Sequence, residues 1–548
     1  MQPTNIHTLP GDNILRVIVD HLEDSHVVNL GMTCKRLREL VSYRVFHTIR
    51  FSNDARISDS ALAAAQKHGT HTKVLHFVGY ASEEDDEVGP SEKPTNRDVL
   101  PESALRLFEA SDGLLPNLET ISINFDHYYG ESSEHGPHGS SIFAKHESWT
   151  DVRAREAKLT MCRLWANTYK ALAEINKGKT PNLIIENWSP RGVSTFQTQE
   201  WRSYLSNLES FDITIISETF EFGFTNAMQG YVEDVQGMED FFFPHLDRVR
   251  SLKISMLWPI MPFGMRGKYH LPLPLKPTAG HLPALEHLEL TNIFISPDLV
   301  DFITSHKNLR TVTLHNAHSA AAQYGECASP PHNITWHEFF DALSTALEES
   351  SNELGLSILT FTSPAPLSET EAKTGKINYK SESKAVKAVR DGLKAFPGRR
   401  LFGYGDMGEQ YGDFISDVKT NRESAIAGLD QAAYEKFLGR LAANRERIVG
   451  ERPAQAREVE VEEREGISVV ELGQRFESME GLGVVGTSED VGTPLNGEVD
   501  VTVNDADRRM EDHAMDLPAS TRLKKKSKGP TEQTEPRRSA RLANKHAS

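Results

Sequence analysis

The chain has 548 residues, a formal net charge of −18, a hydrophobic fraction of 38% and three cysteines. A net negative charge of this size argues against a protein whose main ligand is a nucleic acid, because the phosphate backbone would repel it. The low hydrophobic fraction indicates that part of the chain does not pack into a core. Cys34, Cys162 and Cys327 lie far apart in the sequence, so the spacing supports neither a disulfide framework nor a cysteine zinc site.

The N-terminal residues lack the basic segment and apolar core of a secretion signal. No uncharged apolar run is long enough to span a membrane. We therefore expect an intracellular protein, in the nucleus, the cytoplasm or both, with no membrane partner and no sequence-specific nucleic-acid partner.

Residues 9–41 predict three short helices. In the first, a cap at Asp12 or Asn13 precedes apolar residues at three- and four-residue steps. These residues are Ile14, Leu15, Ile18 and Leu22, and Leu9 and Pro10 come just before the cap. The second helix carries Val27, Val28 and Leu30, and the third carries Leu37, Leu40 and Val41. A core this small barely offsets the chain entropy lost on folding. The unit therefore either caps the following domain or binds a partner.

The order of these signals resembles an F-box, the module that docks a substrate receptor onto the small Skp-family adaptor of cullin-RING ubiquitin ligases. The residues that carry the resemblance are Leu9, Pro10, Ile14, Ile18, Leu22, Leu30, Cys34 and Leu37. The sequence departs from the pattern at Leu37, where many members carry Trp, and at Gly31 and Met32. The resemblance implies that an apolar groove of the adaptor accepts Leu9, Pro10, Ile14, Ile18, Leu22, Leu30 and Leu37. Cys34 then belongs to the core of the module rather than to a reactive site.

A short apolar pattern returns along the next part of the chain. The pattern is an apolar residue, two free positions, a second apolar residue, one free position and a third apolar residue. The second and third residues are two positions apart and therefore share one face of a strand. The examples are Phe46-Ile49-Phe51, Thr72-Leu75-Phe77, Leu118-Ile121-Ile123, Leu208-Phe211-Ile213, Val249-Leu252-Ile254, Leu285-Leu288-Leu290 and Leu309-Val312-Leu314. Each triplet predicts a strand.

Helices are expected between several of these strands. Ser296-Pro297-Asp298 predicts a helix start between the strands at Leu285 and Leu309, which are about 24 residues apart, inside the range of one leucine-rich repeat. The copies resemble a degenerate leucine-rich-repeat solenoid, in which the usual Asn or Cys after the strand is lost and Ile293 stands in its place. The alternative is a series of unrelated β-α units. A solenoid would present an open, strand-lined face that suits another protein better than a small substrate.

Beyond Pro364 the signals change. Val386, Val389 and Leu393 predict a helix, Phe402-Gly403-Tyr404 a last strand, and Arg422 to Ile448 one amphipathic helix. From residue 451 the chain is acidic and poor in apolar residues, which predicts disorder.

The last part of the sequence is basic. Two clusters, Lys524, Lys525, Lys526 and Lys528, then Arg537, Arg538 and Arg541, are spaced like a bipartite nuclear-localisation signal, for which importin would be the partner. The alternative is a solvated basic tail.

The sequence offers no catalytic constellation. It has no phosphate-binding loop, no dinucleotide-binding glycine motif and no nucleophile elbow. His135 and His138 lie in a Gly-rich stretch, and His315 and His318 have no carboxylate or cysteine at ligand spacing. We predict no catalytic residue, no cofactor and no metal.

The prediction is an α/β repeat protein. It comprises a three-helix F-box-like module (5–45), a leucine-rich-repeat-like substrate-binding region (46–410), a C-terminal helical segment (411–450) and a disordered tail (451–548). Its expected role is that of a non-enzymatic substrate receptor that binds the Skp-family adaptor, through it the cullin scaffold, and an unidentified protein target. The alternative role is a nuclear scaffold that uses the repeat surface and the charged tails without a ligase; an enzyme with an unrecognised site is a third possibility.

Overall fold

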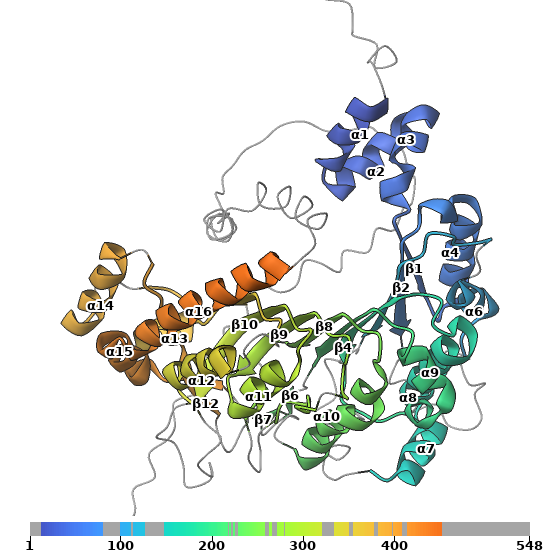
Figure 1. The fold of residues 1–548 in the computed structure, drawn as a ribbon. Helices are drawn as coiled ribbons and strands as arrows, with labels where there is room; N and C mark the ends of the chain where they lie inside the picture. The colour runs from blue at the N-terminus through green and yellow to red at the C-terminus, as the bar shows by residue number, and fades with distance from the viewer. Residues whose placement is uncertain are drawn as a thin grey trace, which may run out of the picture. The chain divides into compact units, whose positions relative to one another are not determined.

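The computed structural model describes residues 12–80, 99–110, 113–126, 147–216, 219–220, 223–224, 228–257, 262–265, 271–278, 280–320, 334–349, 354–377, 382–396, 398–407 and 414–451. They form a mixed α/β fold with a sheet that is parallel over most of its width, so the expected α/β class is confirmed (Figure 1). No helix within these ranges is both long enough and apolar enough to cross a bilayer.

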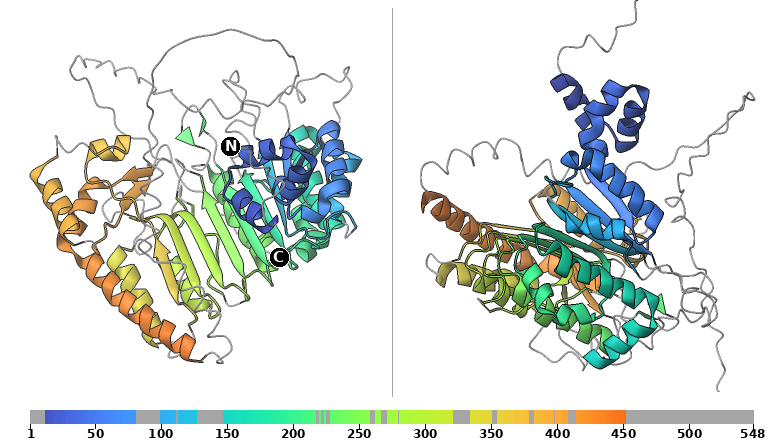
Figure 2. Two further views of the ribbon diagram at one scale, coloured as in Figure 1. Left: turned by 90° about the horizontal axis from the view of Figure 1, so that it is seen from above. Right: turned by 90° about the vertical axis from the view of Figure 1, so that its right-hand side faces the viewer.

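The strands lie side by side in the order in which they follow along the chain (Figures 1 and 2). They are β1 (Thr48–Ser52), β2 (Val74–Tyr80), β3 (Thr120–Asp126), β4 (Asn182–Trp188), β5 (Ser210–Ile215), β8 (Ser251–Met256), β9 (His287–Phe294), β10 (Thr311–Ala320) and β11 (Ile358–Phe361). Each pairs in parallel with the next. A separate antiparallel pair is formed by β6 (Thr219–Phe220) and β7 (Gly223–Phe224).

The long strand β10 pairs with two strands in succession. Its first half pairs with β11, and Ser319 and Ala320 pair with β12 (Tyr404–Met407). β12 in turn pairs in antiparallel fashion with β13 (Phe414–Ser416). A strand near Phe402-Gly403-Tyr404 was expected, but it begins at Tyr404 and is not the last one.

In all seven predicted triplets the second and third residues lie on a strand and are at most 3% exposed, whereas the first residue comes just before the strand. Besides the short antiparallel strands β6, β7 and β13, two parallel strands were missed. In β4, Thr180 holds the first position before Leu183 and Ile185. In β11, Leu356, Leu359 and Phe361 follow the pattern fully and were overlooked.

Helices cover the face of the sheet that carries these buried residues (Figure 2). They include α4 (Ala55–His68), α6 (Glu102–Glu109), α7 (Trp149–Lys158), α8 (Thr160–Ala171), α9 (Gln199–Leu205), α10 (Gln229–Phe241), α11 (Pro297–Ser305) and α12 (Trp336–Glu349). Phe108 of α6 shows the packing, because its ring centroid is 5.0 Å from that of Phe51 and 5.3 Å from that of Phe77. The predicted helix start at Ser296 is confirmed, since its hydroxyl accepts a hydrogen bond from the Leu299 amide at 3.4 Å.

Asparagines with left-handed backbone conformation lie within three strands, β4, β9 and β10. Asn187, Asn292 and Asn316 have φ of 53°, 60° and 53°. Each lies two residues beyond the last triplet position, one residue before the position at which the sequence shows Ile293. The position expected to lack the repeat asparagine does lack it, because Ile293 occupies it; Asn187, Asn292 and Asn316 form a different recurring feature.

The C-terminal part of the described chain is helical. α13 (Glu369–Thr374) and α14 (Lys384–Ala395) follow β11, and α14 buries Val386 and Val389 as predicted. The single helix expected over Arg422–Ile448 is wrong: α15 (Val418–Ala427) and α16 (Leu429–Glu451) are separated by Gly428, whose φ is +70°. Phe437 of α16 is fully buried against Phe340 of α12.

Candidate functional site

Three helices precede the sheet: α1 (Asp12–Asp20), α2 (Asp24–Thr33) and α3 (Lys35–Val45). Their number and order are as predicted. Val19, Val27 and Val41 form their small core. Arg44 ties α3 to the end of α1 by donating to the carbonyl oxygens of Val19 and Leu22, the latter at 2.8 Å, where the helix dipole favours a cation.

The residues predicted to bind an adaptor are distributed unevenly over this helical module. Leu9 and Pro10 lie outside the described residues, and Ile14 lies in α1 although its side chain is not described. Ile18 is 48% exposed, whereas Leu37 is only 7% exposed. Leu22 and Leu30 are partly buried against the valine core. Ile18 is therefore the predicted residue whose described side chain is best placed to touch a partner, and Leu37 supports the module from inside.

Three exposed apolar side chains of the module were not predicted as binding residues. Val17 is 58%, Val28 is 48% and Met32 is 71% exposed. The signal in the sequence is the run Val17-Ile18-Val19: three consecutive apolar residues cannot all share one face of a helix, so a helix that buries Val19 leaves its neighbours outside. We call Val17, Ile18, Val28 and Met32 the exposed apolar residues of the module.

A second surface is the face of the sheet opposite the buried triplets, here called the open face. One transverse row of residues crosses it from β1 to β11 in strand register. The row is Arg50, His76, Ser122, Ile184, Asp212, Lys253, Glu289, Thr313 and Thr360. All except Ser122 are at least partly exposed. The row is polar at eight positions, which fits a surface that meets water or a polar partner.

Charges concentrate at the middle of this row. The ammonium of Lys253 is 3.2 Å from a carboxylate oxygen of Glu289 and 3.8 Å from one of Asp212. Burial raises the pKa of Asp212 to about 6; Lys253 opposes this rise, and Glu289 and Glu186 add to it. Burial alone would lower the pKa of Lys253, but the carboxylates of Asp212 and Glu289 outweigh burial and raise it. Keeping the Asp212 carboxylate ionised on this face therefore costs free energy.

Two histidines flank these charges. His76 lies 3.6 Å from Glu186, which also accepts a hydrogen bond from Ser122 at 2.7 Å. Burial lowers the pKa of His76, Glu186 works against that shift, and Arg50 adds to it. His315 lies 3.6 Å from Glu289. The arrangement suits the recognition of charged and hydrogen-bonding groups across several strands.

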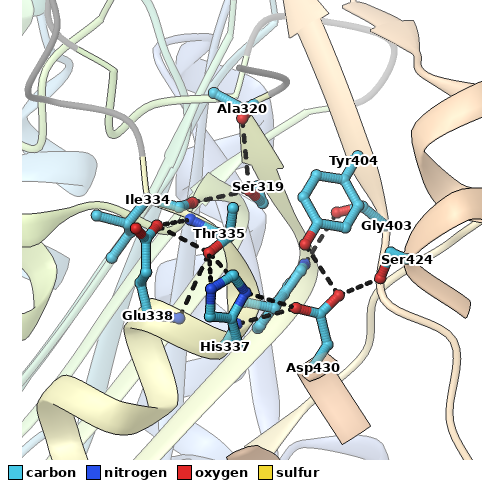
Figure 3. Close-up of polar contacts among 11 residues, drawn as sticks. Ser319, Ala320, Ile334, Thr335, His337, Glu338, Gly403, Tyr404, Ser424 and Asp430 are labelled. Carbon is cyan, nitrogen blue, oxygen red and sulfur yellow. Dashed lines mark hydrogen bonds and ion pairs between the residues drawn. The ribbon is translucent and has the colours of Figure 1, made fainter. Parts of the chain in front are cut away.

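A serine, a histidine and an aspartate also meet near the end of the sheet (Figure 3). Asp430, which is 2% exposed, accepts hydrogen bonds from the Tyr404 hydroxyl at 2.9 Å, from the His337 amide at 3.0 Å and from the Ser424 hydroxyl. The serine donates to the carboxylate, whereas activation of a nucleophile requires that it donate to the imidazole. The set therefore fastens α16 to α12 and β12.

Other predicted features have the following positions. Among the described residues, no three His, Cys, Asp or Glu side chains gather closely enough to hold a metal ion. His135, His138 and the basic residues of the predicted nuclear signal, from Lys524 to Arg541, lie outside the described residues. His318 is buried at the end of β10, beside a cavity.

Neither the known protein families nor the curated proteins include one that matches this sequence.

Proposed function

We propose that this chain is the substrate receptor of a cullin-RING ubiquitin ligase, with α1 to α3 as an F-box-like module that docks on a Skp-family adaptor. The main support is the set of exposed apolar residues on a module whose own core is very small. Large apolar side chains left in water on a marginal three-helix unit favour a binding partner, because burying them on association lowers the free energy. The resemblance of Leu9 to Leu37 to an F-box identifies the partner class.

The β-α units that follow support the second half of the proposal. Strands in sequential parallel order with helices on one face are typical of leucine-rich-repeat-like solenoids, and their open face would hold the protein target. In this role the chain itself performs no chemistry. Tethering raises the effective concentration of target lysines near a ubiquitin-charged enzyme supplied by other subunits.

Adaptor binding by the full chain tests this function. Co-expressed with the Skp-family adaptor of its own organism, the wild-type chain should co-purify with it in equimolar amounts. Ile18→Asp should weaken the association at least tenfold in calorimetry, because it places a charge in an apolar groove. Ile57→Asp is the matched control, since Ile57 is 46% exposed but lies on α4, outside the module.

Failure of the wild-type chain to bind the adaptor would remove the ligase function. The alternative, a scaffold whose N-terminal helices only cap the repeats, predicts that outcome. It also predicts that Ile18→Asp behaves like Ile57→Asp.

A further inference from the structure

A cavity of about 1200 Å³ opens at the carboxyl ends of β10 and β11. Its walls come from four stretches that are distant in the sequence: Asn316 and His318, residues 361–366, residues 399–401 and residues 414–416. Pro364, Pro366, Leu401 and Phe414 make much of the wall apolar. Ligands of parallel sheets commonly bind at this edge, where the strands end and the chain leaves the sheet.

His318 is the unusual residue of this cavity. Its side chain is 1% exposed, and neither ring nitrogen has a hydrogen-bond partner among the described residues. Burial lowers the pKa of His318 to about 3, so the imidazole is neutral at physiological pH. A neutral imidazole has one N–H donor and one nitrogen acceptor. Leaving such a group unpaired destabilises the folded state, which favours a role outside folding.

The surrounding residues hold the imidazole at this position. The ring centroid of Phe414 is 4.4 Å from that of His318. A Cβ at Gly405 would come within 2.4 Å of the Phe414 ring, and one at Gly403 would come within 3.0 Å of the His318 Nδ1. Gly403, just before β12, and Gly405 within it therefore allow the close packing of the cavity wall. The Ser416 hydroxyl is a second buried polar group of the lining without a partner among the described residues.

The cavity lining includes charged side chains of both signs. Lys373, Arg399 and Arg400 contribute to it, as do Glu369 and Glu371. Glu371 is already bound by Arg390, whose Nη2 is 2.7 Å from its carboxylate oxygen. Arg400 is an exposed residue whose guanidinium lies over the rings of Phe361 and Tyr434 and donates a long hydrogen bond of 3.5 Å to the Phe361 carbonyl oxygen. Arg400 thus keeps donors for an anionic group.

We propose that this cavity binds a short extended segment of the protein target, with an apolar side chain against Pro364 and Phe414, a backbone amide at His318 and a carboxylate at Arg400. The proposal rests on the proposed function, because it names the part of the target that the receptor recognises. The amide is the matching group for His318, since it offers both a donor and an acceptor. A free anion offers acceptors alone and would leave one imidazole nitrogen unpaired.

A peptide selection on the purified full chain tests the proposal. The probe is a displayed library of random dodecapeptides, and the expected consensus is an apolar residue close to Asp or Glu. Binding of the enriched peptides is then measured by fluorescence anisotropy. Arg400→Glu and His318→Leu should each weaken binding at least tenfold. Arg248→Glu, at an exposed arginine remote from the cavity lining in the sequence, should leave binding unchanged.

Thermal unfolding separates recognition from a structural role of His318. Because His318→Leu removes an unpaired buried polar group, it should raise the unfolding midpoint while peptide binding falls. A lowered midpoint, enriched peptides that bind the cavity variants as well as the wild type, or no enrichment at all would each overturn the proposal. Adaptor binding is measured in a separate assay without peptide. Loss of the peptide site therefore leaves the ligase function standing, and loss of adaptor binding leaves the peptide site standing.

Discussion

The side-chain amide of Asn316 donates a hydrogen bond to the amide oxygen of Asn292, the equivalent residue on the neighbouring strand. Asn292 in turn donates to the carbonyl oxygen of Met256 at the end of β8. Further along the sheet, the side-chain amide of Asn187 on β4 donates to the amide oxygen of Asn124 on β3 at 3.1 Å. Asparagine tolerates the left-handed backbone at these positions, and its side chain joins each strand to the preceding one.

Asn292→Ala should lower the free energy of unfolding by about 1–3 kcal/mol, because it orphans the Met256 carbonyl and places alanine at a φ of 60°. Chemical denaturation followed by tryptophan fluorescence measures the change. Asn292→Gly should recover the backbone part of the loss but not the hydrogen bonds. Asn117→Ala is the control: it removes an exposed bond to the Thr70 carbonyl and should cost no more than about 0.5 kcal/mol. Equal effects of Asn292→Ala and Asn117→Ala would contradict a structural role for this asparagine.

The strands could be predicted from the sequence because two buried residues at a spacing of two are a local signal. Thr180 shows the limit of that signal, since it is polar although it is 1% exposed and holds the first triplet position, just before β4. The break at Gly428 is also local and could have been recognised as a helix end. The cavity could not be predicted from the sequence, because Asn316, Arg400 and Phe414 meet only after the chain has folded. Exposure of Ile18 beside buried Val19 likewise depends on how the three helices pack.

Stability should depend on pH through Asp212. The ordinary pKa of an aspartate is 3.8, and in the folded protein burial raises that of Asp212 to about 6. The folded state therefore binds this proton more tightly than the unfolded state, so the contribution of Asp212 is most favourable below pH 3.8 and is lost as pH rises through 6. Asp212→Asn should stabilise the protein at pH 7.5 by on the order of 1–3 kcal/mol, and the gain should vanish near pH 4.

Unfolding of the wild type and Asp212→Asn across this pH range measures the difference between them. Asp247→Asn serves as the control, because Asp247 is exposed at the turn before β8. A difference between the wild type and Asp212→Asn that does not change with pH would contradict the raised pKa.

Leu37 and Ile18 of the helical module should respond differently to truncation. Leu37→Ala should speed hydrogen exchange in α1 to α3 of the full chain, because loss of a buried leucine typically costs 2–5 kcal/mol. Ile18→Ala should leave exchange nearly unchanged, since about half of that side chain is already exposed. Adaptor binding should fall for both variants, for Leu37→Ala through the module and for Ile18→Ala through the contact. Fast exchange in Ile18→Ala would show that this residue supports the module rather than the interface.

Asp430 should be the most sensitive polar position at the contact of α12 and α16. Asp430→Ala leaves the Tyr404 hydroxyl, the Ser424 hydroxyl and the His337 amide without their buried acceptor, so we expect a loss of about 3 kcal/mol or more. Ser424→Ala removes one donor and should cost about 1 kcal/mol. The matched control is Asp341→Ala on α12, where a carboxylate that is 49% exposed pairs with Lys436 at 2.8 Å; it should cost less than about 1 kcal/mol. Thermal and chemical unfolding of the three variants rank these effects, and comparable losses for Asp430→Ala and Asp341→Ala would show that burial of the Asp430 network contributes little.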